Sequence, residues 1–330
     1  MTGAGGAGGI AVVAIGRNEG ERLRACLASV LRFANLVVYV DSNSTDDSVA
    51  MAKALGVDVI VLPADVAFTA ALARNAGWRR AREIAPQVEF IQFVDGDCAV
   101  VEGWIPRAHE FLTSHSDVVA VCGRRRERYP DRSIYNTLCD MEWATPIGEA
   151  KACGGDVMMR AAALDAVGGY RDSLIAGEEP ELCVRLRAQG GRVWRLDAEM
   201  TLHDAAMTRI GQWWKRSMRA GYAYAEGAHL HGAPPERHCV RASRRAWVWG
   251  LGIPLASLLG ALLWSPWALA ALLVYPLQML RLYLGFGGPL KARAARAAFT
   301  VLGKFAEAFG QLKFMARRLS GGPARLIEYK

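Results

Sequence analysis

Residues 10–123 alternate short apolar runs with amphipathic stretches, and this alternation constrains the fold more than any other feature. Four runs have the near-continuous apolar character of buried strands: IAVVAI (10–15), LVVYV (36–40), VDVIVL (57–62) and VEFIQFV (88–94). Helical periodicity follows each of the first three, the last of them through the seventies and early eighties. This order predicts an α/β fold with a mostly parallel central sheet flanked by helices. For the second helix we expect Ser44 or Thr45 as the cap and Gly56 as the end.

Three of the strand candidates end in polar residues. These ends are Arg17-Asn18-Glu19, Asp41-Ser42-Asn43 and Asp95-Gly96-Asp97. Each group alone could be an ordinary turn or a helix cap. Because ligands bind beyond the carboxyl ends of the strands in such a sheet, the three groups together predict one shared site. Two carboxylates separated by one glycine suit a divalent cation that holds a phosphate.

The composition indicates a folded protein with phosphate-bearing or membrane partners. The 330 residues are 52% hydrophobic and 22% charged, which excludes a disordered chain. The net charge of +8 favours phosphate-bearing ligands or an anionic membrane surface, and we expect no nucleic-acid partner. The seven cysteines form no CxxC pair, so we expect reduced thiols and no zinc. Residues 1–9 predict a flexible leader without the features of a signal peptide.

The strand-end groups belong to an ordered series of motifs. The series is AIGRNEG, YVDSNSTDDS, RNAGWRRA, FVDGD, GGDVMMR, GEEPELCVRLRAQGG and GQWWKRSMRAGY. It resembles the motifs of the GT-A fold glycosyltransferases, specifically the inverting family 2, over roughly residues 10–225. The resemblance implies a GT-A catalytic domain at 10–235, with a nucleotide-binding half at about 10–123 and an acceptor half at about 124–235. It also implies a nucleotide-diphosphate sugar, a UDP- or GDP-sugar, as the donor.

By this resemblance FVDGD is a DxD motif that holds Mg²⁺ or Mn²⁺. Asp97 would bind the metal, and Asp95 would lie near the ribose or in the water shell of the metal. Gly96 would let the backbone approach the ligand closely. His203, in LHDAAM, occupies a position where some GT-A enzymes have a further metal or phosphate contact, although a lone histidine is more often structural.

The resemblance also implies which residues contact the nucleotide sugar. These are Arg17, Asn18, Glu19, Asp41, Ser42, Arg74 and Asn75, together with Asp95 and Gly96. Ser42 stands where many relatives have a second aspartate, so the identity of the base stays open. Arg74 and Asn75 would lie near the diphosphate or support the metal loop; alternatively, Arg74 is an exposed helix residue.

An inverting transfer needs a base that takes the proton of the acceptor hydroxyl. GEEPELCVRLRAQGG predicts a helix with Pro180 at its first position and Gly190 just past its end. Glu178 and Glu179 would lie at the positive end of the helix dipole, which favours the ionised carboxylate. Glu179 occupies the aspartate position of the family motif and is the expected base, with Glu178 as the second choice. Helix capping alone would also explain these charges.

Two further motifs are expected near the acceptor or the diphosphate. Their residues are Gly154, Gly155 and Asp156 in GGDVMMR, and Gln212, Trp213 and Arg216 in GQWWKRSMRAGY. The second motif predicts a helix with Gln212, Arg216 and Arg219 on one face. It lacks the Arg-Trp pair of processive family members, which argues against processive polymerisation. This basic, tryptophan-rich helix could also lie against a membrane.

Residues 246–284 predict a hairpin of two transmembrane helices. The uncharged stretch of 18 residues that begins at Trp247 would span about 27 Å as a helix. Basic residues flank both ends, which predicts cytoplasmic ends and an outward-facing tip at Ser265-Pro266. A re-entrant hairpin, or one buried in the protein, would also fit. Residues 288–330 predict a basic amphipathic helix and tail at the interface, or packed on the catalytic domain.

Together these features predict a metal-dependent inverting glycosyltransferase on the cytoplasmic membrane, with its catalytic domain facing the cytosol. The acceptor would be lipid-linked or a glycolipid, in polysaccharide or glycolipid biosynthesis. Two alternatives stay open. One is a sugar nucleotidyltransferase, although the segment after the first strand is acidic and poor in glycine. The other is a non-catalytic membrane scaffold with the same fold.

Overall fold

The computed structural model describes residues 9–66 and 68–321, so the expected leader lies outside the described residues except for Gly9. The chain divides into two compact units. The first comprises Met1–Tyr129 and Asp140–Ala205, and the second comprises Pro130–Cys139 and Ala206–Lys330.

The first unit is built on a sheet whose described strands number nine. They are β1 (Ile10–Gly16), β2 (Leu36–Asp41), β3 (Asp58–Val61), β4 (Phe90–Asp95), β5 (Cys98–Val100), β6 (Val118–Glu127), β7 (Gly148–Ala150), β8 (Val157–Arg160) and β9 (Arg192–His203). Their order is β3-β2-β1-β4-β8-β6-β9-β5, and β7 pairs with β9. Parallel pairing joins β3, β2, β1 and β4, as the sequence predicts. Antiparallel pairs beyond β4 make the sheet as a whole mixed.

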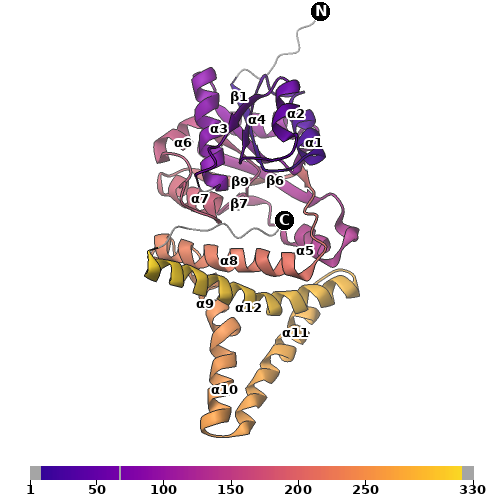
Figure 1. Cartoon of the computed structure of the whole chain (residues 1–330), viewed down its shortest axis with the longest axis vertical. Coiled ribbons are helices and arrows are strands. Elements are labelled where there is room, and N and C mark those ends of the chain that lie inside the picture. The colour runs from indigo at the N-terminus through magenta and orange to yellow at the C-terminus, as the bar shows by residue number, and fades with distance from the viewer. Residues whose placement is uncertain (1–8, 67, 322–330) are drawn as a thin grey trace, which may run out of the picture. The chain divides into compact units, whose positions relative to one another are not determined.

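Helices cover both faces of this sheet (Figure 1). One layer contains α1 (Glu21–Val30), α2 (Ser48–Ala54) and α4 (Trp104–Ser114), and the other contains α3 (Ala70–Ile84), α6 (Ala161–Val167) and α7 (Glu178–Ala188). The short 3₁₀ helix η1 (Pro130–Arg132) and α5 (Ile134–Glu142) follow β6. In β1, Val12 and Ala14 pack toward the first layer, and Ala11 and Val13 toward the second. The apolar run is continuous because both faces are covered.

The sequence explains how α3 is held on the sheet. Thr69 caps its start by accepting the Leu72 N–H at 3.0 Å. Gly77 lies against β1 so closely that a Cβ there would be 2.2 Å from Val13 Cγ1. Since α3 is the next element after the carboxyl end of β3, its first turns, with Arg74, lie at the carboxyl edge of the sheet.

Two local predictions are wrong. α2 begins at Ser48 without a side-chain cap, because the Ser44 hydroxyl donates to Asp41 instead. Pro180 is the third residue of α7 and not the first, since the helix already begins at Glu178 after Gly177. The predicted end of α7 holds, because Gly190 has a φ of 85° two residues past the helix.

The second unit is helical. Besides η1 and the first residues of α5, it contains α8 (Ile210–His231), α9 (Val240–Trp247), the π-helix η2 (Val248–Gly252), α10 (Ile253–Leu263), the 3₁₀ helix η3 (Pro266–Leu273), α11 (Val274–Gly285) and α12 (Leu290–Ser320). α8 and α12 lie side by side, and α10 and α11 form the two arms of a hairpin (Figure 1). A Cβ at Gly310 would lie 1.9 Å from the Met218 carbonyl oxygen, so glycine allows the backbones of α12 and α8 to touch.

The hairpin carries an extensive exposed apolar surface. Two helical stretches, Val240–Leu263 and Pro266–Gly285, are long and apolar enough to cross a membrane, and few of their residues are buried. Trp264 and Trp267 beside the turn are 94% and 85% exposed. This exposure does not fit the alternative of a hairpin buried within the protein.

Candidate active site

The three polar strand ends converge at the carboxyl edge of β2, β1 and β4. The Asn18 N–H donates to Ser44 Oγ at 2.8 Å, and the Thr45 N–H donates to Asn18 Oδ1 at 2.7 Å. The Gly96 N–H donates to the Ile15 carbonyl at 2.7 Å, which ties the end of β4 to that of β1. The sheet edge that the sequence predicts is therefore present.

Asp41 organises the turn after β2. It is fully buried, and its carboxylate accepts the hydroxyls of Tyr39 (2.7 Å) and Ser44 (2.5 Å) and the Ser44 N–H (2.7 Å). Burial and the contact with Asp41 raise the pKa of Tyr39 above its ordinary value, so this hydroxyl keeps its proton at neutral pH. Asn18 and Asn43 adopt left-handed conformations, with φ of 54° and 62°. The turn is thus fixed by internal bonds of the protein.

The other residues expected at the nucleotide lie along the same edge. The Arg17 guanidinium lies over the Phe68 ring at 5.3 Å. Glu19 pairs with Arg22 at 2.7 Å. The Ser42 N–H donates to the carbonyl of Gly16 at 2.9 Å.

Two arginines bridge the acids of the site. Arg74 is 2% exposed and donates to Glu178 and to Asp95, both at 2.7 Å. Arg125, on β6, contacts Asp156 at 2.8 Å and Asp95 at 3.3 Å. Asp95 therefore lies between two guanidinium groups, and Arg74 is not an exposed helix residue.

Burial alone would lower the pKa of both arginines, but their carboxylate partners outweigh it and raise the pKa of each above its ordinary value. Asp156, which is fully buried, also accepts the Asp95 N–H (2.9 Å) and the Thr201 hydroxyl (2.7 Å). The sequence predicts Asp156 near the acceptor or the diphosphate; in the structure its side chain is buried and bonds to the Asp95 N–H from inside the protein.

Gly155 and Asn75 also act from within the protein. A Cβ at Gly155 would lie 2.5 Å from Arg74 Nη2 and 2.8 Å from Asp95 Oδ2, so only glycine leaves room for this ion pair. The amide of Asn75 is fully used: Nδ2 donates to the Tyr170 carbonyl (2.7 Å), and Oδ1 accepts the Tyr170 N–H (2.9 Å). These bonds make Asn75 a support of the loop at residue 170.

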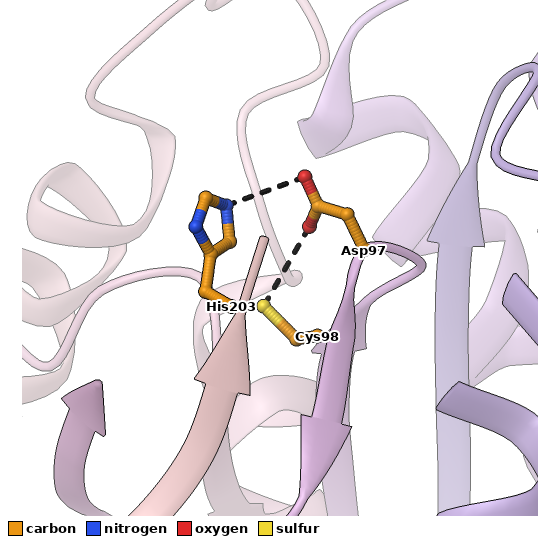
Figure 2. Close-up of side chains that lie close together, drawn as sticks. All are labelled: Asp97, Cys98 and His203. Atoms are coloured by element: carbon orange, nitrogen blue, oxygen red, sulfur yellow. Dashed lines mark hydrogen bonds and ion pairs between the residues drawn. The ribbon is translucent and has the colours of Figure 1, made fainter. Parts of the chain in front are cut away.

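Asp97, Cys98 and His203 lie together and point toward one another (Figure 2). His203 Nε2 is 3.3 Å from Asp97 Oδ2, and the Cys98 thiol lies 3.6 Å from Asp97 Oδ1. All three side chains are buried, and one ligand atom from each lies within 4.8 Å of the others. Cys98 and His203 are direct cross-strand partners in β5 and β9, which places their side chains on the same face.

This donor set fits a divalent metal. Asp97 would supply a carboxylate oxygen and His203 an imidazole nitrogen, which are ligands of Mn²⁺ and related ions. His203 Nδ1 is buried without a hydrogen-bond partner in the described structure, and Glu127 Oε2 lies 3.6 Å from it. A carboxylate behind a ligating histidine is the usual arrangement at metal sites.

The two acids of α7 have different surroundings. Glu179 is 1% exposed, and its oxygens accept the N–H groups of Cys153 (2.9 Å) and Gly154 (2.8 Å) and the Cys183 thiol (2.9 Å). Burial is the largest cause that raises the pKa of Glu179 above its ordinary value. The Glu178 side chain is 12% exposed and pairs with Arg74.

The expected residues of α8 lie in the second unit. Gln212 accepts the N–H groups of Thr208 (2.9 Å) and Arg209 (3.0 Å), which caps the helix. Trp213 is 7% exposed and packs its ring edge against Phe299 at 4.7 Å. Arg216 lies on the same helix and is partly buried.

Sequence reasoning missed three residues of the site: Arg125, Glu127 and Trp143. Arg125 and Glu127 alternate along β6 toward the interior, whereas Arg126 between them bonds to Asp140 at 2.9 Å. The available signal was the charged run RRRE at the end of an apolar strand, because alternate residues of a strand face opposite sides of the sheet. No pattern predicts that the Trp143 ring lies edge-on to His203 at 4.8 Å and beneath the guanidinium of Arg125 at 5.6 Å.

Comparison with known proteins agrees with this geometry. Residues 11–154, which include the DxD loop, match the model of the glycosyl transferase family 2. These residues are therefore similar to a family 2 glycosyltransferase domain. A curated relative from Rickettsia felis, an "uncharacterized glycosyltransferase", is 44% identical over 54 residues, which are 16% of this chain. That match spans only 19% of the relative's length.

The GT-A fold is supported by one of the solved structures to which the chain is similar. A mannosyltransferase from Pyrobaculum calidifontis, in complex with GDP-Man and Mn²⁺, aligns with a TM-score of 0.55 and 18% identity, covering 94% of this chain and 86% of its own. Glucosyl-3-phosphoglycerate synthase from Mycobacterium tuberculosis aligns with a TM-score of 0.47 and 15% identity, covering 68% of this chain and 80% of its own.

Proposed function

We propose that this protein is a metal-dependent inverting glycosyltransferase. It transfers a sugar from a UDP- or GDP-sugar to a lipid-linked or glycolipid acceptor at the cytoplasmic face of a membrane. The observation that carries the proposal is the convergence of Asp97 and His203 with the arginine-bridged acids Asp95 and Glu178 at one sheet edge. Transfer from a nucleotide diphosphate needs a cation seat that is in place before charge develops on the leaving group.

Asp97 and His203 would hold Mg²⁺ or Mn²⁺, which neutralises the charge that develops on the leaving diphosphate. Arg74 and Arg125 hold Asp95 beside this seat in one orientation. Because these ion pairs are formed before the donor binds, the site needs little rearrangement when charge develops on the leaving diphosphate.

The base comes from the acids at the start of α7. Burial raises the pKa of Glu179 above its ordinary value, which is the direction that favours a general base, but its oxygens are bonded to the loop at 153–154. Glu178 is more exposed, lies one residue away and pairs with Arg74 at 2.7 Å. Glu178→Gln and Glu179→Gln separate the two roles. The variant of the base should lose about 10²–10⁴-fold in kcat, whereas loss of a loop support should act mainly on KM.

The membrane assignment rests on the second unit. The apolar arms of the hairpin end in the exposed tryptophans 264 and 267, as expected for an interfacial aromatic belt. The amphipathic α12 would lie in the membrane interface. A lipid-linked acceptor would then be held in the same membrane as the enzyme. To test the orientation, Ser265→Cys is labelled in intact cells with a membrane-impermeant maleimide. Labelling only after permeabilisation would contradict an outward-facing tip.

The function is tested with purified protein, Mn²⁺ and a panel of nucleotide sugars. We expect release of nucleoside diphosphate from one donor class, and its loss in Asp97→Ala. Asp197→Asn, which changes an exposed acid of the same unit, is the matched control and should keep full activity. Release of pyrophosphate from a nucleoside triphosphate and a sugar phosphate would instead identify a nucleotidyltransferase. Absence of turnover with every donor would favour the scaffold.

A further inference from the structure

We propose that Asp97, Cys98 and His203 form a site for a borderline transition metal of the Zn²⁺ or Co²⁺ class, in which Cys98 binds as a thiolate. This goes beyond the proposed function, for which an oxygen and an imidazole ligand on Mg²⁺ or Mn²⁺ are sufficient. The spacing of the cysteines along the chain argues against zinc, because it contains no cysteine pair. The tertiary structure instead brings one cysteine beside an aspartate and a histidine.

The geometry gives three ligands of three kinds around one point. Cys98 is fully buried, and its thiol faces the carboxylate of Asp97 and the imidazole of His203 (Figure 2). The positions are fixed by the backbone, since Cys98 and His203 are register partners and the Asp204 N–H donates to the Asp97 carbonyl at 3.1 Å. Three protein ligands with one open position are the composition of catalytic and exchangeable zinc sites.

The surroundings of His203 also fit a metal ligand. Nε2 faces Asp97, and Nδ1 is buried 3.6 Å from the Glu127 carboxylate without a hydrogen bond in the described structure. Glu127 is itself held by the N–H groups of Tyr129 and Ala205, both at 3.1 Å. A metal on Nε2 would fix the proton on Nδ1, toward Glu127.

The thiol decides which metals the site prefers. Thiolate and imidazole ligands favour Zn²⁺ and Co²⁺ over Mg²⁺, and the affinity of such sites rises along the first-row series from Mn²⁺ through Co²⁺ to Cu²⁺, with Zn²⁺ below Cu²⁺. A second group, Asp95, Cys98 and Asp156, also lies close enough to hold an ion. Both of its acids are paired with Arg125, so a cation there would first have to displace this guanidinium.

Binding at this site has a defined proton balance. The Cys98 S–H bond breaks, the thiolate binds the metal and the proton leaves to the buffer, with no change in oxidation state. Since Asp97 belongs to both sites, Zn²⁺ and Mn²⁺ compete for it. If the proposed transferase function holds, Zn²⁺ should therefore inhibit Mn²⁺-supported transfer.

The test is a Co²⁺ titration of the full-length protein in detergent, followed by absorption. We expect one thiolate-to-cobalt charge-transfer band in the near ultraviolet, which Zn²⁺ abolishes by displacement. Cys98→Ser should remove the band, and Cys239→Ser, a half-buried cysteine of the second unit, should keep it. Glu127→Gln should weaken Co²⁺ binding by about 10–100-fold. Co²⁺ binding without the band, or a band that survives Cys98→Ser, would overturn the proposal.

A measurement on the unaltered protein covers the case in which Cys98→Ser does not fold. X-ray absorption of the Zn²⁺-loaded chain should contain one sulfur neighbour at about 2.3 Å, whereas a shell of only nitrogen and oxygen near 2.0–2.1 Å would refute thiolate binding. Neither readout needs turnover. An intact thiolate band in a protein without transfer activity would therefore count against the proposed function alone.

Discussion

Replacing Arg125 by methionine tests whether the buried ion network holds the site together. The guanidinium lies 2.8 Å from Asp156, whose side chain is fully buried, so its removal leaves a buried carboxylate without its cation. Such a loss costs about 3–5 kcal/mol. The second partner, Asp95, is 27% exposed at 3.3 Å and adds little, which favours the lower end of the range. For a unit of this size, about 3 kcal/mol lowers Tm by roughly 6–12 °C.

The assay must report on the first unit alone, because two units need not unfold together. Hydrogen exchange of peptides from β6 and β8 during a urea titration fulfils this condition. Arg126→Met is the matched control: it lies on the same strand, pairs with Asp140 and is 34% exposed, so it should cost less than about 1 kcal/mol.

A double-mutant cycle with Asp156→Asn separates the pair from simple loss of packing. If the pair is coupled, the double variant should lose less free energy of unfolding than the two single variants lose together, by at least about 1 kcal/mol. Equal losses for Arg125→Met and Arg126→Met, or strict additivity in the cycle, would refute the reasoning.

Three further predictions follow from the packing, the pKa shift and the metal seat. Gly310→Leu should destabilise the second unit by about 1–3 kcal/mol, because its side chain would meet the Met218 carbonyl; Leu302→Ala, at a 40% exposed position of α12, should change little in urea unfolding of the same unit. Burial raises the pKa of Glu179 above 4.5, so the folded unit binds the proton more tightly, and stability should fall as the pH rises above 4.5 through the raised pKa. Glu179→Gln should flatten this part of the stability profile, and an unchanged slope would contradict it. Removal of divalent metal by EDTA should abolish donor hydrolysis, and Mn²⁺ should restore it, as measured by released nucleoside diphosphate.

Local sequence predicts the elements that depend on neighbouring residues. Apolar periodicity correctly places the strands β1 to β4 and the helices α1, α3 and α12, because this periodicity depends only on which faces of each element are covered. The helices α7 and α8 lie at the two motifs for which a helix was predicted. The predictions fail where a side chain has a choice of partner. Ser44 could cap α2 or bond to Asp41, and only the folded turn decides between these.

The roles within the site depended more on the tertiary structure. The sequence selected Asp95, Asp97 and His203 by their motifs, but it could not predict that Arg74 and Arg125 would hold Asp95 from two sides. It also did not indicate that both the amide nitrogen and the amide oxygen of Asn75 bond to the backbone of the loop at residue 170. Hydrogen-bond partners far apart in the chain become neighbours only when the sheet forms.

What the sequence alone determined is the alternation that builds an α/β sheet with polar strand ends, together with an apolar hairpin that suits a bilayer. These features follow from periodicity and hydrophobicity, which act within a few residues. The tertiary structure alone decided which acids are bridged, which are buried, and that Cys98 faces His203. Strand register sets those distances, and register is a property of paired strands and not of either strand by itself.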